Sequence, residues 1–119
     1  NWYPFTSAEE PFTEYTQAIA CNKIRNNRNS NHTFAVQATG FTGKLIVLGT
    51  LDPVPPVNIQ DYFVVELDDC STEIVLDDFS GVEYYNITSN LFWVKFKLIW
   101  DDTILQEDNG TVDKILWRS

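Results

Sequence analysis

The chain has 119 residues, a length that suits one domain, and 44% of its residues are hydrophobic and 14% aromatic. Its formal net charge of −9 predicts repulsion from a phosphate backbone, so we expect no direct nucleic-acid binding. No apolar run approaches the ~18 residues that a membrane-spanning helix needs, and no membrane partner is expected. The chain begins with Asn1 and lacks an apolar signal core, so we expect it to be processed or part of a longer product.

The first twelve residues differ in pattern from the rest of the chain. Trp2, Tyr3, Phe5 and Phe12 are interleaved with prolines and follow no clean period. We therefore predict that residues 1–12 form an extended arm rather than a strand, and that residues 13–119 form a single domain. Aromatic rings on such an arm would be buried when it docks on a neighbour, so these four residues are candidate partner-binding residues.

A short Asn-rich segment, residues 22–31, concentrates basic charge in an otherwise acidic chain. Its sequence is NKIRNNRNSN, and the candidate partner-binding residues in it are Lys23, Arg25 and Arg28. Such a segment could contact an anionic surface, including the acidic surface of a second copy. The alternative is a polar loop between the first and second strands.

Residues 91–101 alternate between apolar and polar side chains with a period of two, as a half-buried strand requires. The apolar row, which we expect to point into the core, consists of Phe92, Val94, Phe96, Leu98 and Trp100. Lys95 and Lys97 fall on the opposite face, outside that core.

The remaining pattern predicts strands separated by turns. Further strands are expected at residues 14–20, 32–39, 44–51, 62–67, 72–76, 82–88 and 111–118. Turns are expected at residues 78–81 and 108–110, and the two glycines in residues 39–43 predict a tight hairpin turn. Residues 52–60 contain three prolines, which cannot join a central strand.

Seven or eight short strands at a spacing of about ten residues predict an all-β fold. We expect an antiparallel β-sandwich or a jelly-roll-like arrangement, with the N-terminal arm outside it. No segment carries a convincing helical stripe with caps.

The residues that carry chemistry indicate no reaction. Acidic pairs at residues 68–69, 77–78 and 101–102 do not match the spaced loop of a calcium site, so we expect solvated turns. His32 is the only histidine, and no nucleophile, phosphate-binding or zinc motif occurs. We therefore expect no enzyme activity, cofactor or metal.

Two further observations leave alternatives open. Cys21 and Cys70 could form one long-range disulfide or remain two buried thiols. Trp93 lies on the face opposite the apolar row, where it would be either an exposed platform for a sugar or a partner, or part of a second buried layer.

Three stretches of the sequence together form a recognisable succession of strands and turns. Residues 33–52 read TFAVQATGFTGKLIVLGTLD and precede the aromatic pair Tyr62 and Phe63; residues 85–93 read YNITSNLFW; residues 109–118 read NGTVDKILWR. This order resembles small β-sandwich virion structural proteins of tailed marine phages, including cyanophages. In those, a G-x-F-x-G turn leads into x-L-x-x-x-G-T-L-D, and the domain closes on G-T-x-D-K-I-L.

The resemblance implies a structural role in the virion, as a capsid decoration or other accessory subunit assembled in the host cytoplasm. Its partners would then be other virion proteins and copies of itself. It carries over no catalytic or cofactor residue. The alternative is a carbohydrate-binding or tail-fibre adhesive domain that recognises a host surface glycan, with Trp93 as the first candidate platform.

Overall fold

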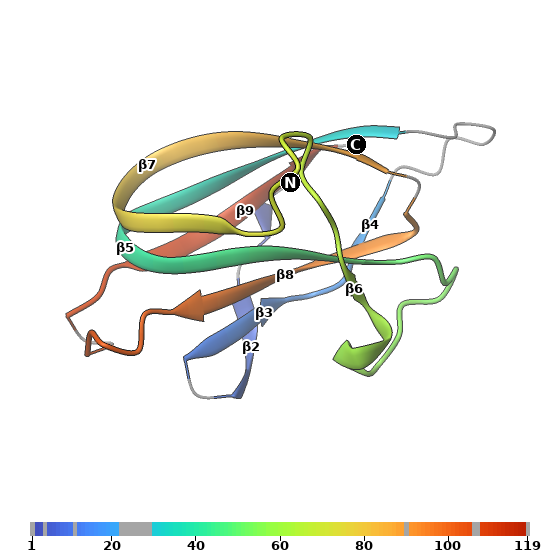
Figure 1. The fold of residues 1–119 in the computed structure, drawn as a ribbon. Helices are drawn as coiled ribbons and strands as arrows, with labels where there is room; N and C mark the ends of the chain where they lie inside the picture. The colour runs from blue at the N-terminus through green and yellow to red at the C-terminus, as the bar shows by residue number, and fades with distance from the viewer. Residues whose placement is uncertain are drawn as a thin grey trace.

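The computed structural model describes residues 2–3, 5–10, 12–21, 30–89, 91–105 and 108–118. Its elements are β1 (Trp2–Tyr3), β2 (Phe5–Glu10), β3 (Thr13–Thr16), β4 (Ile19–Ala20), β5 (Ser30–Thr50), the 3₁₀ helix η1 (Ile59–Asp61), β6 (Phe63–Val64), β7 (Ile74–Ser89), β8 (Trp93–Trp100) and β9 (Thr111–Arg118). The strands form one curled sheet with antiparallel pairings, so the predicted all-β antiparallel fold is confirmed (Figure 1). Within this described part, no helix has the length and hydrophobicity to cross a membrane.

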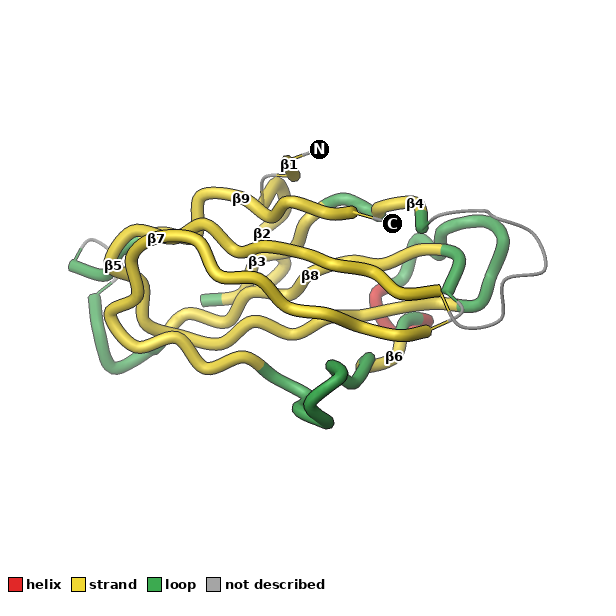
Figure 2. Tube along the Cα trace, turned by 90° about the horizontal axis from the view of Figure 1, so that it is seen from above, coloured by secondary structure: helices red, strands yellow, loops and turns green. Residues whose placement is uncertain are grey.

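The long strand β5 belongs to both layers of a sandwich-like fold. Its first half pairs with β9, for example Val36 with Ile115, and its second half pairs with β8, for example Val47 with Phe96. β7 follows β5 along the other edge through both halves. Both strands turn over at the same end of the molecule, so their halves stack on one another (Figures 1 and 2).

The turn of β5 is a bend inside one strand, so the predicted hairpin at residues 39–43 is wrong. Gly40 has a φ of 59°, and the register with β7 shifts on both sides of Phe41. Glycine allows this left-handed conformation without a Cβ clash, and a bulge sharpens a bend in a strand. The flanking halves of β5 pair with β7, β8 and β9 rather than with each other, so the glycines mark a corner of the sheet.

β7 bends opposite this corner, which corrects the second predicted turn. Residues 78–81 lie within the strand, where Asp78 has a φ of 48° and Gly81 a φ of 118°. The Ser80 hydroxyl accepts a hydrogen bond of 2.7 Å from the Gly40 backbone N–H, which ties the two bends together. The separately predicted strands at residues 72–76 and 82–88 are therefore two halves of β7. The predicted strand at residues 62–67 is reduced to β6.

The core lies between the two layers and is held by aromatic contacts across them. Phe34 from the first half of β5 meets Phe96 of β8 edge to face, with ring centroids 4.9 Å apart. Phe96 also meets Trp117 of β9 at 6.0 Å. These rings are almost fully buried, so each layer supplies the apolar surface that the other covers.

The alternating row of β8 enters this core with one exception. Val94, Phe96 and Leu98 are fully buried and Trp100 packs against the cluster, as predicted. Phe92 does not point into the core, because it precedes the strand and is 40% exposed. Leu91, 6% exposed, fills the core at this end. Lys95 and Lys97 lie on the outer face, where both are half-buried.

The N-terminal residues pair with the sheet instead of forming a separate arm. β1 pairs with β9 through Trp2 and Leu116, and β2 pairs with β3. Tyr3 and Phe5 pack against the core cluster. The expectation of an extended arm rather than a strand is therefore wrong for β1 and β2, because sheet edges pair with their backbone groups and the core accommodates Tyr3 and Phe5.

Candidate interaction surfaces

β7 is a strand of 16 residues that pairs with β5 along one of its edges, and its other edge is the first candidate surface. β7 pairs with β5 from Ile74 opposite Leu45 to Ser89 opposite Ser30. Among the described residues, no strand lies against the other edge of β7. The turn at residues 67–70 approaches it at one point, where the Asp68 N–H donates to the Asn86 carbonyl at 3.0 Å. An edge strand of this length offers backbone donors and acceptors to another chain.

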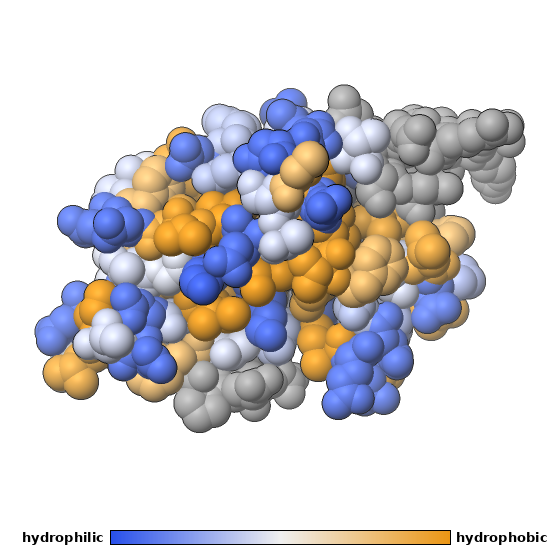
Figure 3. Space-filling view, viewed as in Figure 1, coloured by the Kyte–Doolittle hydropathy of each residue, from blue (hydrophilic) through white to orange (hydrophobic). Residues whose placement is uncertain are grey.

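Exposed apolar side chains accompany this edge. Val75 is 67% exposed, Val82 45% and Tyr84 64%. Figure 3 shows a band of apolar atoms across β5, β6 and the first half of β7, flanked by hydrophilic side chains. On β6, Val64 adds a side chain that is 50% exposed. Apolar side chains that gather around an open edge are typical of a protein-interaction surface.

A second surface lies where β5 and β7 bend. An open groove of about 560 Å³ is lined by Thr42, Gly43, Lys44, Val75, Leu76, Asp77, Ile99, Trp100, Asp101 and Asp102. We call it the end groove. The sheet register places Leu76 and Trp100 on either side of Gly43. The acidic residues that follow them, Asp77 and Asp101, therefore line the same groove.

Thr42 holds the two acidic turns of the end groove. Its carbonyl accepts from the Asp101 N–H at 3.3 Å, and its hydroxyl accepts from the Asp78 N–H at 3.0 Å. Both acidic pairs are evident in the sequence, but their proximity is not, because they are more than twenty residues apart. The sequence feature that could have indicated this proximity is Gly43, which lies between β7 and β8.

The acidic turns carry internal hydrogen bonds. Asp101 Oδ1 accepts from the Thr103 hydroxyl at 2.6 Å and from its N–H at 2.9 Å, and these bonds lower the pKa of the Asp101 carboxyl. Ser71 makes the same two bonds to Asp69 and lowers its pKa likewise. In the described part of the chain, no three His, Cys, Asp or Glu side chains cluster to hold a metal.

The aromatic candidates belong to different elements of the fold, apart from Trp2 and Tyr3, which are neighbours in β1. Tyr3 and Phe5 contact the core, and Phe12, with a φ of 60°, is half-buried while its carbonyl accepts from the Trp100 N–H at 2.8 Å. Trp2 is placed by its backbone pairing in β1. Trp93 is half-buried, and its indole N–H donates to the Pro53 carbonyl at 3.1 Å. Of the side chains that the structure describes, Tyr3 and Phe5 thus pack against the core, whereas Trp93 is tied to the loop at Pro53.

The other predicted residues have separate environments. Lys23, Arg25 and Arg28 lie outside the described residues. His32 is buried and stacks on Trp117, with centroids 5.1 Å apart. Cys21 is buried, Cys70 is exposed, and no disulfide joins them. Comparison of the chain with protein-family models, curated proteins and solved structures found no match in any of the three.

Proposed function

We propose that this chain is a structural protein of a phage virion, which attaches to neighbouring virion proteins and reinforces the particle as a capsid decoration or accessory subunit. It would act in the virion through protein contacts and without catalysis or a cofactor. The open edge of β7, with its exposed Val75, Val82 and Tyr84, is the observation that carries this proposal.

The resemblance to marine-phage virion proteins supports the proposal from the sequence. Its three stretches correspond to most of β5, to the connection from β7 to β8, and to β9. β5 pairs with β7, β8 and β9, so the stretches lie side by side in the sandwich. The resemblance therefore concerns a connected part of the fold.

The edge of β7 suits attachment by strand addition. A strand from a neighbouring subunit can pair with free backbone groups along an edge, while side chains on alternate positions supply apolar contact. Val82 and Tyr84 lie opposite Gln37 and Ala35 of β5, on one face of that half of the sheet. A partner strand beside β7 would cover their rings and methyl groups, which otherwise remain in water.

The experiment that tests the proposal has two parts. First, particles of the phage that encodes the chain are purified, and the chain is quantified in them against the major capsid protein. We expect a fixed copy number per particle, whereas absence from purified particles would overturn the proposal.

Second, Val82→Lys with Tyr84→Lys is introduced into the chain. Two lysines beside an edge oppose pairing with another strand, so we expect loss of incorporation with an unchanged β-sheet spectrum. Asn58→Lys with Gln60→Lys is the matched control, since it adds equal charge at exposed positions away from β7. If the edge variant incorporates as well as the control, β7 is not the attachment surface. Selective binding of the purified chain to a glycan would favour the adhesive alternative.

A further inference from the structure

The end groove combines an apolar floor with an acidic rim. Val75, Ile99 and Trp100 supply apolar surface, while Asp77, Asp101 and Asp102 supply carboxylates. Lys44 is the cation among its lining residues, and its ammonium group lies 3.3 Å from the Glu73 carboxylate. The charge of that lysine is therefore offset locally, and the groove has a net negative charge.

The hydrogen bonds of the Asp101 turn favour the charged form of that carboxyl group. Since both bonds from Thr103 stabilise the carboxylate form, Asp101 stays ionised at and below neutral pH. A ligand for the groove should therefore be cationic and carry some apolar surface. Peptide segments with Lys or Arg beside an aliphatic residue meet both conditions.

The chain itself contains such a segment. Residues 22–31, which we call the basic segment, hold Lys23, Arg25 and Arg28, three of the eight Lys and Arg residues in the chain. Ile24 stands between the first two, and the segment contains no Asp or Glu. It is the part of the sequence whose charge best complements the end groove.

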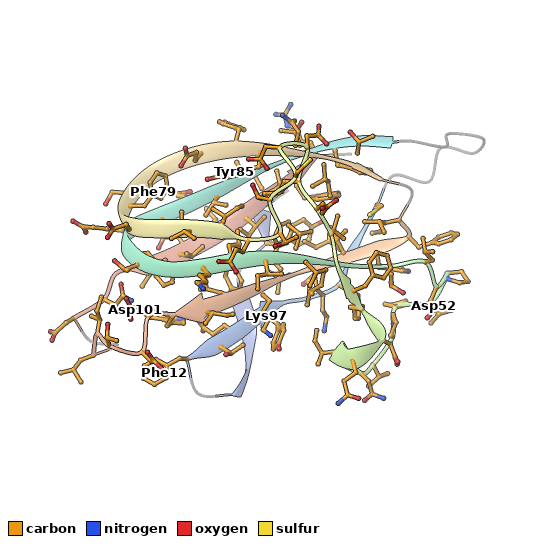
Figure 4. The ribbon with its side chains drawn as sticks, in the orientation of Figure 1. Phe12, Asp52, Phe79, Tyr85, Lys97 and Asp101 are labelled. Atoms are coloured by element: carbon orange, nitrogen blue, oxygen red, sulfur yellow. The ribbon has the colours of Figure 1, made fainter. Side chains whose placement is uncertain are left out.

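The ends of the basic segment lie far from the groove of the same molecule. Cys21, just before it, donates its N–H to the Phe92 carbonyl, and Ser30 pairs with Ser89. From Phe92 to Trp100 the chain covers about 26 Å, and from Ser30 to the bend at Gly40 about 33 Å, at ~3.3 Å per residue. Figure 4 shows Asp101 at the end of the molecule opposite Asp52.

This separation excludes binding within one molecule. The chain from Cys21 to Ser30 spans at most about 32 Å when fully extended. A path from Cys21 to the groove and back to Ser30 would need nearly twice that length. The groove of one molecule can therefore take only the basic segment of another.

We propose that the end groove binds the basic segment of a second copy of this chain. The groove and the residues that flank the segment, Cys21 and Ser30, are far apart in the fold, so the contact is head to tail and leaves one groove and one segment available for further copies. The inference goes beyond the proposed function, because it concerns association of the purified chain and requires no virion partner.

Sedimentation of the purified chain over a range of concentrations tests the contact. We expect association that weakens with added salt, since exposed charges are screened.

Two variants test the surfaces. The groove variant, Asp77→Asn with Asp102→Asn, should raise the dissociation constant by about tenfold. The segment variant, Lys23→Gln with Arg25→Gln and Arg28→Gln, should have the same effect. Asp52→Asn with Asp61→Asn removes the same charge from exposed positions outside the groove and should leave association unchanged. A wild-type chain that stays monomeric at low salt, or equal losses in variant and control, would overturn the proposal.

A mixture of the two variants gives the sharper test. The groove variant keeps its basic segment and the segment variant keeps its groove, so together they should form a one-to-one dimer and nothing longer. A mixture that remains monomeric, or that forms longer assemblies, would contradict the head-to-tail contact.

A synthetic peptide of residues 22–31 provides a readout that does not depend on the folding of a variant. It should shift the amide resonances of groove residues in the wild-type chain, and shifts spread over other surfaces would equally contradict the assignment.

Discussion

Phe34 and Phe96 meet edge to face across the core, with ring centroids 4.9 Å apart and ring planes at 60°. One ring comes from the first half of β5 and the other from β8, so the contact joins the two layers. Phe34 is 1% exposed and Phe96 is 0% exposed. Their packing therefore depends on the bend that brings the layers together.

Replacing Phe96 with Ala should lower the free energy of unfolding by ~3–5 kcal/mol, because the lost ring leaves a cavity between the layers. Chemical denaturation measures this change. Phe92→Ala is the matched control, since Phe92 is 40% exposed, and it should cost less than ~1 kcal/mol. Similar losses in the two variants would contradict the described core.

Gly110 approaches the bend of β5 so closely that a side chain has no room. A Cβ atom at this position would lie 1.7 Å from the Thr39 carbonyl oxygen and 2.3 Å from the Gly40 carbonyl carbon. Gly110→Ala must therefore displace backbone and should prevent or severely weaken folding. Gly40→Ala meets only a conformational cost of ~1–2 kcal/mol, because its Cβ would lie 3.5 Å from the nearest atom. Thermal unfolding of both variants tests this order of stability.

Trp100 and Glu14 connect β8 to β3 through a partly buried hydrogen bond of 2.8 Å from the indole N–H to Oε1. Glu14→Ala removes the acceptor and should cost ~1–3 kcal/mol. Glu14→Gln keeps an acceptor oxygen and should cost less. Denaturation of the two variants separates loss of the bond from loss of the charge, and an equal cost would show that the charge matters more.

Tyr85 predicts a loss of stability at high pH. Burial and the nearby Glu83 carboxylate raise its pKa to about 12. The unfolded chain loses this proton near pH ~10, so the native state holds it more tightly. The contribution is fully present below about pH 10 and is lost as the pH rises through about 12.

Tyrosinate absorbance and denaturation at several alkaline pH values measure this effect. Tyr85→Phe should remove one late-titrating tyrosine and flatten the decline in stability. The decline should not vanish, because burial also raises the pKa of Tyr62. Glu83→Gln should shift the Tyr85 transition to lower pH, and no shift would show that Glu83 does not act on it.

Local pattern predicted the strands whose two faces differ. Residues 111–118 form β9 as expected, and the alternation in residues 91–101 identified β8 and most of its buried row. The prediction that Phe92 points into the core was wrong because β8 begins only at Trp93, and alternation assigns side chains to a face only within a strand. The continuity of β5 was missed for a related reason, since a glycine at a corner of a sheet and a glycine in a hairpin have the same composition.

The candidate surfaces depended on pairings that sequence alone does not contain. Tyr3 and Phe5 seemed suited to docking, yet available edges on β9 and β3 draw their strands onto the domain. The end groove appears only when Gly43 lies between Leu76 and Trp100. Local periodicity does not specify which distant strands become neighbours, so neither surface could be derived from it.

The pairing of β9 with the first half of β5 also determines when this chain can fold during synthesis. Val36 acquires its neighbour Ile115 only after almost eighty further residues have been translated. Until β9 leaves the ribosome, the first half of β5 lacks one of its two flanking strands and the ring of Phe34 lacks its neighbour Trp117. Folding of the sandwich is therefore expected to follow translation of residue 118 instead of proceeding strand by strand, and its many distant pairings favour folding in milliseconds to seconds.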